Sequence, residues 1–190
     1  ALAHMAAASC GGLGASFLLR EDGYLWALGR YRWNGVETTG TLQIMEGVKS
    51  AQINTWQDNL VLKRDGTLLG WNQWGVSSSE YSYNLCNYNE PTQILDGVYQ
   101  VFFFEQQAYA VKSDGTLWAW GLNRSGILGD GTETRRVTPV QVMLEEQAEP
   151  EPSDPVEVPV VRVAAGSRHS LAVKTDGTVW AWGSNAYGQL

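Results

Sequence analysis

The chain has 190 residues, of which 44% are hydrophobic and 11% aromatic, and it carries a formal net charge of −7 at pH 7. No apolar run approaches the roughly 20 residues of a membrane-spanning helix, so we expect no membrane insertion. Most of the excess acid lies in one segment, 145–157, and the rest of the chain is nearly neutral without a basic stripe. Direct binding to nucleic acid is therefore not expected.

A strand-like segment, in most cases rich in Trp, follows an Asp-Gly pair four times along the chain, in EDGYLWALG (21–29), RDGTLLGWN (64–72), SDGTLWAWG (113–121) and TDGTVWAWG (175–183). Alternating apolar residues lead into each pair. Asp-Gly between two such runs is a strong hairpin signal, because Gly tolerates the positive φ of the turn. A recurring unit of this size predicts an array of small modules.

Each module contains further strand candidates on either side of the hairpin. A first strand precedes it at 4–9, 48–53, 98–103 and 160–165, and a fourth strand follows it in three modules, at 41–45, 91–95 and 139–143. Four short strands without helical periodicity are typical of a propeller blade. We divide the chain into blade repeats at 1–47, 48–97, 98–144 and 159–190, the last one truncated, with an acidic, Pro-rich insertion at 145–158.

The strand after each hairpin turn separates large from small side chains. Trp118 and Trp120 flank Ala119, and Trp180 and Trp182 flank Ala181. Because successive strand residues point to opposite faces, each such strand has one bulky face and one shallow face. This pattern favours a sheet that is stacked between two similar sheets, since a solvent-facing sheet would carry polar residues on one side.

Two segments, GLNRSGILGDGTETRRVTPVQVM (121–143) and VVRVAAGSRHSLAVKTDGTVWAWGSNAYGQL (160–190), resemble repeats of the regulator-of-chromosome-condensation family. The resemblance implies an all-β fold, a β-propeller of four-stranded antiparallel blades. About four blades are present, as an incomplete arc of a seven-bladed ring. We therefore expect the sequence to be a fragment of a longer one. Self-association through the open blade edges, or a smaller ring, are the alternatives.

No residue set in the sequence predicts catalysis, a metal site or a cofactor, and we expect a protein that is not an enzyme. His169 and Ser170 are the one adjacent base and nucleophile, but neighbours on a strand point to opposite faces. The spacing of Cys10 and Cys86 fits no zinc signature, so we expect free thiols, with a disulfide as the alternative. The acidic insertion is expected to be a solvated loop, or alternatively a tether for a cationic partner.

Aromatic residues gather in the loops that follow the hairpins, at 30–40 and 72–90, and supply the candidate partner-binding set: Tyr31, Trp33, Trp74, Tyr81, Tyr83 and Tyr88. Amphipathic rings on polar loops make effective protein-binding surfaces. We therefore predict a protein-interaction scaffold whose partner protein, of unknown identity, binds these loops on one rim of the propeller. The alternative is that the rings anchor the loops to the blades. Trp56 lies on a different turn and is a candidate for the opposite rim.

The family resemblance also implies other roles. Members include a guanine-nucleotide exchange factor for a small GTPase and a secreted inhibitor of β-lactamases. The exchange factor uses a blade insertion and a basic tail, and neither is found in this sequence. The plain repeats KSDGTLWAWG and KTDGTVWAWG are similar to those of bacterial members, so a bacterial, secreted or cell-surface location is expected.

Overall fold

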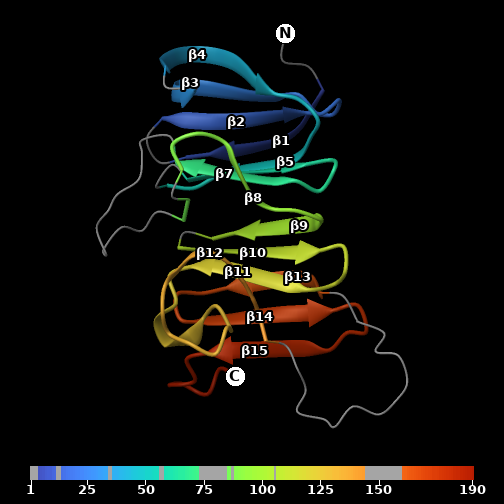
Figure 1. Cartoon of the computed structure of the whole chain (residues 1–190), viewed down its shortest axis with the longest axis vertical. Helices are drawn as coiled ribbons and strands as arrows, with labels where there is room; N and C mark the ends of the chain where they lie inside the picture. Colours follow the sequence, from blue (N-terminus) through green and yellow to red (C-terminus); the bar gives the residue numbers. More distant parts are fainter. Residues whose placement is uncertain are drawn as a thin grey trace.

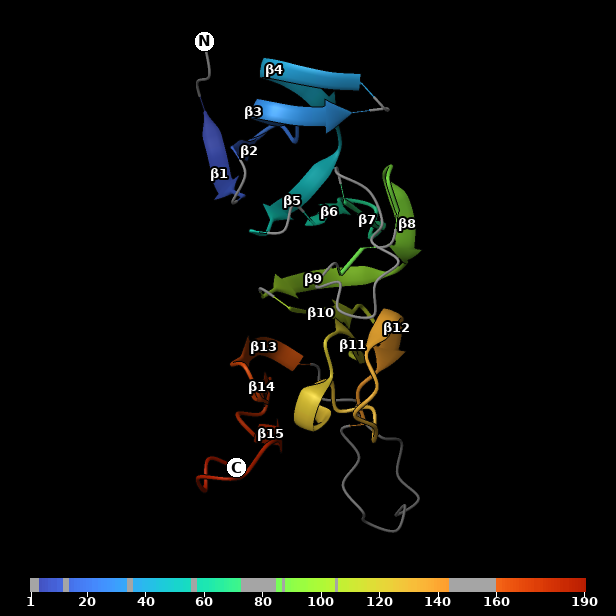
Figure 2. The ribbon, with the colours of Figure 1, turned by 90° about the vertical axis from the view of Figure 1, so that its left-hand side faces the viewer.

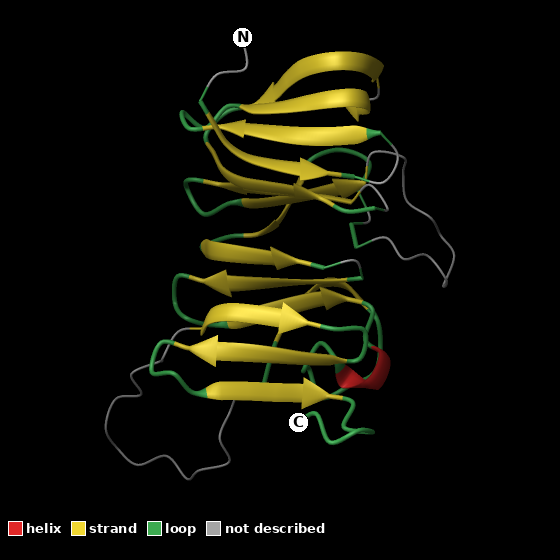
Figure 3. Ribbon diagram, turned by 180° about the vertical axis from the view of Figure 1, so that it is seen from behind, coloured by secondary structure: helices red, strands yellow, loops and turns green. Residues whose placement is uncertain are grey.

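The fold is built almost entirely from strands. The computed structural model describes residues 4–11, 14–33, 36–55, 58–72, 85–86, 88–104, 106–143 and 160–190. Within these ranges the strands form four antiparallel sheets, and one short 3₁₀ turn, η1 (Arg124–Gly126), follows the third hairpin (Figure 3). Among the described residues, no helix reaches the length and hydropathy needed to span a membrane. The expected all-β class is confirmed.

Each sheet is one blade, and its strands follow one another in chain order. Blade 1 comprises β1 (Met5–Cys10), β2 (Ala15–Arg20), β3 (Leu25–Trp33) and β4 (Val36–Met45). Blade 2 comprises β5 (Val48–Ile53), β6 (Asp58–Lys63), β7 (Leu68–Asn72) and β8 (Thr92–Leu95). Blade 3 comprises β9 (Val98–Phe103), β10 (Gln107–Lys112), β11 (Leu117–Gly121) and β12 (Arg136–Gln141). Blade 4 has three described strands, β13 (Val160–Ala165), β14 (His169–Lys174) and β15 (Val179–Gly183).

The four blades stack along the long axis of the molecule, from blade 1 near the N-terminus to blade 4 near the C-terminus (Figure 1). Turned by 90°, the molecule shows its first strands, β1, β5, β9 and β13, along one side and its fourth strands, β4, β8 and β12, along the other (Figure 2). The arrangement is an open arc of propeller blades. The first strands of blades 2, 3 and 4 have the bounds that the sequence predicts.

Each Asp-Gly pair forms the turn between the second and third strands of its blade. In blade 3, Asp114 Oδ1 accepts a hydrogen bond from the backbone N–H of Thr116 at 3.0 Å, and Gly115 has φ +89°. The same bond recurs between Asp176 and the N–H of Thr178 at 2.8 Å. Hydrogen bonds from the two Thr residues hold the pKa of both carboxyls below its ordinary value. The turn is therefore set by local chemistry that every blade repeats.

The hydrophobic core lies between the blades, as the two-faced strands predict. Between blades 1 and 2, Phe17 and Ala27 pack against Trp71. Between blades 2 and 3, Leu60 packs in one cluster with Trp120. Between blades 3 and 4, the buried cluster includes Tyr109, Ala119 and Ala172, and Trp182 packs against it.

Polar contacts align neighbouring blades across these apolar interfaces. The indole N–H of Trp71 donates to the hydroxyl of Tyr31 at 3.1 Å, and that of Trp182 donates to the carbonyl of Ile127 at 2.6 Å. The same carbonyl accepts the hydroxyl of Tyr109 at 2.7 Å. Each of these indoles thus finds its acceptor in the preceding blade, which satisfies a polar group that burial would otherwise destabilise.

One expectation about secondary structure is wrong. Segment 30–40 is not a loop, because β3 continues to Trp33 and β4 begins at Val36, with Tyr31 paired to Thr38 and Trp33 paired to Val36. Aromatic and β-branched residues favour strands. The residues between the two strands, Asn34-Gly35, are a typical hairpin dipeptide that also indicates a β-ribbon.

Blade 1 lacks a threonine that blade 3 uses to hold its indole. Thr116 Oγ1 accepts a hydrogen bond from Trp118 Nε1 at 3.0 Å. Tyr24 occupies the equivalent position in blade 1, and Trp26 Nε1 is buried without a hydrogen-bond partner among the described residues. We expect the threonine of the Tyr24→Thr variant to supply this acceptor. The Tyr24→Thr protein should then have a free energy of unfolding in urea about 1 kcal/mol higher than that of the Tyr24→Val protein. Valine has the same shape without the hydroxyl, and equal stability of the two variants would contradict this account.

Candidate functional site

The molecule has two edges at which the strand connections lie. We call the edge with the Asp-Gly turns the turn rim, and the edge at which β3, β7, β11 and β15 end the loop rim. At the loop rim an equivalent backbone hydrogen bond joins the residue before the second strand to one repeat position, at or just after the third strand, in three blades. The bonds run from Arg30 N to Gly14 O, from Leu122 N to Gln106 O and from Ser184 N to Arg168 O. Blades 1, 3 and 4 thus share this backbone bond at the loop rim, whereas the connections that follow it differ in sequence.

The six predicted site residues divide into two groups. Trp74, Tyr81 and Tyr83 lie outside the described residues. Tyr31, Trp33 and Tyr88 are described, and all three pack against the core cluster between blades 1 and 2. The structure therefore brings the described half of the set together at one blade junction, on the loop rim.

The rings at this junction form one connected group, the rim cluster, which consists of Phe17, Tyr31, Trp33 and Trp71. Tyr31 stacks on Trp33 with ring centroids 6.4 Å apart and also meets Phe17 edge-on at 5.7 Å. Trp33 in turn meets Trp71 edge-on at 5.9 Å. Offset and edge-to-face pairs of this kind stabilise each other beyond the area that they bury.

The members of the candidate set differ in exposure. Tyr31 is only 1% exposed, and burial raises the pKa of its hydroxyl, which accepts the hydrogen bond from Trp71. It acts as an anchor between blades and offers no contact surface. Trp33 is half-buried, with Arg32 exposed beside it on β3. Tyr88 is half-buried, and its backbone carbonyl accepts a hydrogen bond from Asn72 N at 2.7 Å.

A buried carboxylate, Asp58, holds the connection between β7 and β8 in place. Its side chain accepts hydrogen bonds from the backbone N–H groups of Leu85 at 2.9 Å and Cys86 at 3.1 Å. The side-chain amides of Asn54 and Asn72 donate to it as well, each at 3.1 Å. Burial raises the pKa of Asp58, and the four hydrogen bonds oppose that shift by favouring the charged form. One side chain therefore bonds to the residues on both sides of segment 73–84, which carries Trp74, Tyr81 and Tyr83.

Sequence reasoning did not identify this anchor. The position of Asp58 is occupied by Ala15, Gln107 and His169 in the other blades, so an acid there is peculiar to blade 2. Asp58 also pairs with Asn72 across the sheet, which places the ends of the β5–β6 connection at the loop rim. The sequence makes Trp56, which lies within this connection, a candidate for the opposite rim, and that stays a prediction. Trp56 itself lies outside the described residues.

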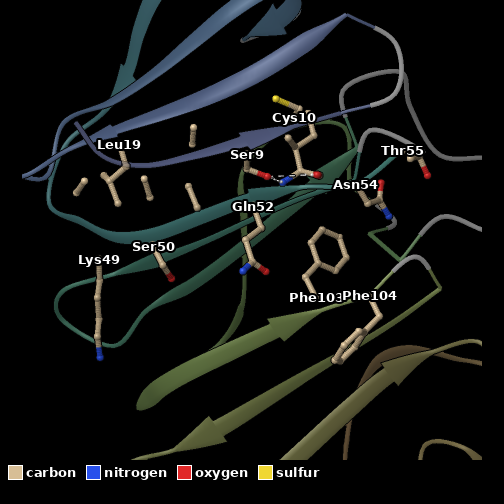
Figure 4. A pocket seen from close by; sticks show the side chains of 15 residues that line it. Ser9, Cys10, Leu19, Lys49, Ser50, Gln52, Asn54, Thr55, Phe103 and Phe104 are labelled. Carbon is tan, nitrogen blue, oxygen red and sulfur yellow. Dashed lines mark hydrogen bonds between the residues drawn. The ribbon is translucent and has the colours of Figure 1, made fainter. Parts of the chain in front are cut away.

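A cavity of about 580 Å³ opens on the first-strand side of blades 1 and 2. Residues of β1 and β5 line it, and Phe103 and Phe104 close one end (Figure 4). Ser9 Oγ, at its wall, accepts a hydrogen bond from Ile53 N at 3.0 Å and so ties the two first strands together. None of the residues that line the cavity belongs to the rim cluster.

Ser170, Cys10 and Cys86 are the nucleophilic side chains that the sequence singles out. Ser170 is fully buried and bonded to Tyr109 and to the carbonyl of Ile127, so it serves the interface between blades 3 and 4. Cys10 is exposed and Cys86 is buried, and both thiols are free. The described residues contain no group of three or more His, Cys, Asp or Glu side chains arranged to hold a metal ion.

Comparison with known proteins finds family matches in the third and fourth blades. Residues 114–173 and 160–189 match two family models, each described as a regulator of chromosome condensation (RCC1) repeat. The ultraviolet-B receptor UVR8 of Arabidopsis thaliana is 29% identical over 182 residues, which cover 90% of this chain and 39% of the receptor.

Two solved structures have a similar fold. The crystal structure of human WBSCR16 gives a TM-score of 0.67 at 19% identity, covering 98% of this chain and 50% of that one. Prp20p of Saccharomyces cerevisiae, whose structure was described with its binding to Gsp1p and histones, gives 0.60 at 22% identity, covering 90% of this chain and 41% of that one. The chain thus spans half or less of the length of these three proteins.

Removal of the buried carboxylate tests its role as the anchor of the β7–β8 connection. We expect Asp58→Ala to lower the free energy of unfolding by about 3 kcal/mol or more, because four buried donors lose their acceptor. In a Cys10→Ser background, Cys86 should also become open to thiol-labelling reagents under native conditions, because its backbone N–H loses the bond to Asp58. Asp58→Asn keeps one acceptor oxygen. Its free energy of unfolding and its labelling rate should therefore lie between those of Asp58→Ala and wild type. An unchanged labelling rate in Asp58→Ala would show that the anchor lies elsewhere.

Proposed function

We propose, from the regulator of chromosome condensation repeats matched at 114–173 and 160–189, that the chain is a non-enzymatic protein-interaction scaffold that holds a partner protein on its loop rim. In a repeat protein the shared positions build the scaffold, and specificity lies in residues that differ between copies. The four hairpins follow one pattern, whereas the connections at the loop rim differ from blade to blade. Partner recognition is accordingly assigned to the loop rim.

The rim cluster is the observation that supports this proposal most strongly. Trp33 is half-buried, and its ring is held from two sides by Tyr31 and Trp71. A ring that is already fixed loses little side-chain freedom when a partner covers it. Tryptophan, tyrosine and arginine are also the residues that contribute most often to binding energy at protein interfaces, and Arg32 lies exposed beside Trp33.

The contact set follows from these placements. We assign partner contact to Trp33, Trp74, Tyr81, Tyr83 and Tyr88, and we assign Tyr31 the supporting position beneath Trp33. The segment with Trp74, Tyr81 and Tyr83 joins Asn72 to Leu85, and both of these residues bond to Asp58.

Nucleotide exchange on a small GTPase is the second role that the family offers. Prp20p binds Gsp1p, but a similarity at 22% identity supports a shared fold alone. Among the described residues, no group of side chains favours nucleotide exchange over the scaffold role. We therefore keep the scaffold role as the proposal and use a nucleotide-exchange assay as a control. Purified chain should not accelerate nucleotide release from a panel of small GTPases.

Paired substitutions on the two rims test the scaffold proposal. We expect Trp74→Ala combined with Tyr83→Ala to weaken binding of a purified partner by at least about tenfold, because aromatic anchors at an interface are each worth about 1–4 kcal/mol. The thermal midpoint of the chain should stay unchanged. Tyr99→Ala is the matched control, because Tyr99 is 58% exposed on β9 near the turn rim, and it should leave binding intact.

The partner for this measurement is first captured with immobilised chain, identified by mass spectrometry and purified. A large fall in the thermal midpoint of the double variant would show that the two rings stabilise the blades. Loss of binding in Tyr99→Ala with retention in the double variant would move the site to the turn rim.

A further inference from the structure

The fourth strand of a blade is the outer edge of its sheet, and these edges lie along one side of the molecule (Figure 2). Among the described strands, none pairs with the free edge of β4, β8 or β12. Blades stack through their faces, so the stacking of blades 1 to 4 leaves this side open. A free strand edge presents a row of N–H and C=O groups to which another extended chain can pair.

Blades 2 and 3 protect this edge with proline. Pro91 directly precedes β8, and Pro139 lies within β12. The two prolines are equivalent, because the residues that follow them, Thr92 and Val140, pair with the same repeat position of the third strand. Proline has no N–H group and cannot donate to an added strand.

Blade 1 lacks this protection. Thr41 occupies the place of the two prolines, because the next residue, Leu42, pairs with that same repeat position at Ala27. The strand is also ten residues long, against four in β8 and six in β12. It contains neither proline nor lysine, which commonly keep a strand edge from pairing. The edge of blade 1 is therefore open where those of its neighbours are closed.

The register of blade 1 shows which backbone groups of β4 lie at the free edge. Arg30 N donates to Gly14 O, so the backbone groups of Arg30 point to the β2 side of β3. Directions alternate along a strand, so the next residue, Tyr31, directs its groups to its partner Thr38 on β4. The same alternation on β4 gives the residues whose N–H and C=O groups point away from β3, which are Glu37, Thr39 and Thr41.

The face of β4 toward blade 2 indicates which side chains an added strand should carry. Leu42 packs against the core cluster between blades 1 and 2, and Val36, on the same face, is 62% exposed. Gly40 lies between them, and a Cβ built there would meet no atom within 4 Å. Large apolar side chains at alternate positions of an added strand would cover Val36 and fill the space beside Gly40.

We propose that β4 binds an extended peptide segment of a partner protein, which adds a fifth strand to blade 1. The backbone groups of Glu37, Thr39 and Thr41 pair with about six residues of this segment, whose side chains alternate between apolar and polar. The contact uses main-chain groups on the fourth-strand side and none of the side chains assigned to partner contact on the loop rim. It therefore goes beyond the proposed function and does not depend on it.

A phage-displayed library of random heptapeptides, depleted on Thr41→Pro and then panned on the immobilised wild-type chain, supplies the probe. A selected peptide is synthesised, and its binding is measured by fluorescence anisotropy. Thr41→Pro should weaken binding by about tenfold or more, because the edge loses a main-chain donor and gains a ring in its place. Thr41→Val is the matched control, because valine keeps the N–H and the shape of threonine, and it should bind like wild type.

Methylation of single backbone nitrogens of the peptide tests strand pairing without any change in the protein. In an added strand every second N–H points to β4. N-methylation should therefore weaken binding at alternate residues and leave it nearly unchanged at the residues between them. Circular dichroism verifies that Thr41→Pro is folded, as we expect from the prolines at the equivalent place in blades 2 and 3.

Four results would overturn the proposal. The first is a panning that yields no peptide with a preference for wild type over folded Thr41→Pro. The second is a Thr41→Val variant that binds as weakly as Thr41→Pro. The third is a methylation series without alternation. The fourth is self-association of the wild-type chain that is lost in Thr41→Pro, which would show that the edge pairs with a second copy instead.

Discussion

The insertion of a bulky side chain from one blade into the shallow face of the preceding blade is the interaction on which this structure depends. Trp71 and Trp120 are each about 1% exposed, and burial of such a ring contributes on the order of a few kcal/mol. The shallow face is made by residues such as Ala27 and Ala119, whose small side chains leave room for it. Indole N–H groups then need acceptors, and Tyr31 and the carbonyl of Ile127 supply them from the preceding blade.

The same contacts couple the scaffold to the surface proposed for recognition. Tyr31 lies on β3 near the loop rim, accepts the indole of Trp71 from blade 2 and supports the ring of Trp33. The junction of two blades and the candidate binding surface are thus parts of one aromatic group. Asp58 adds a second coupling, because it bonds to blade 2 and to the connection with the remaining candidate residues. Changes at Tyr31, Trp33 or Asp58 will therefore act on stability as well as on binding.

Local and repeated features of the fold could be predicted from the sequence. Asp-Gly turns and alternating side chains are short-range signals, so the strands of each hairpin and the two faces of each blade follow from them. The sequence does not predict that β3 extends through Trp33, because the charged residues Arg30, Arg32 and Glu37 are typical of a polar loop. The dipeptide Asn34-Gly35 is the signal that indicates a hairpin there. The role of Asp58 depends on bonds to Leu85 and Cys86, which lie far along the chain and leave no local pattern.

One substitution made at two equivalent positions tests blade stacking most directly. Ala119 is fully buried beneath blade 4, and Ala181 holds the same repeat position on the uncovered face of blade 4. Urea unfolding, at a concentration where the chain is monomeric, should show that Ala119→Leu loses about 1–3 kcal/mol through overpacking. Ala181→Leu should change the free energy of unfolding by no more than about 0.5 kcal/mol, as expected for a surface position. Equal losses at the two positions, or no loss at Ala119, would contradict the stacking of these blades.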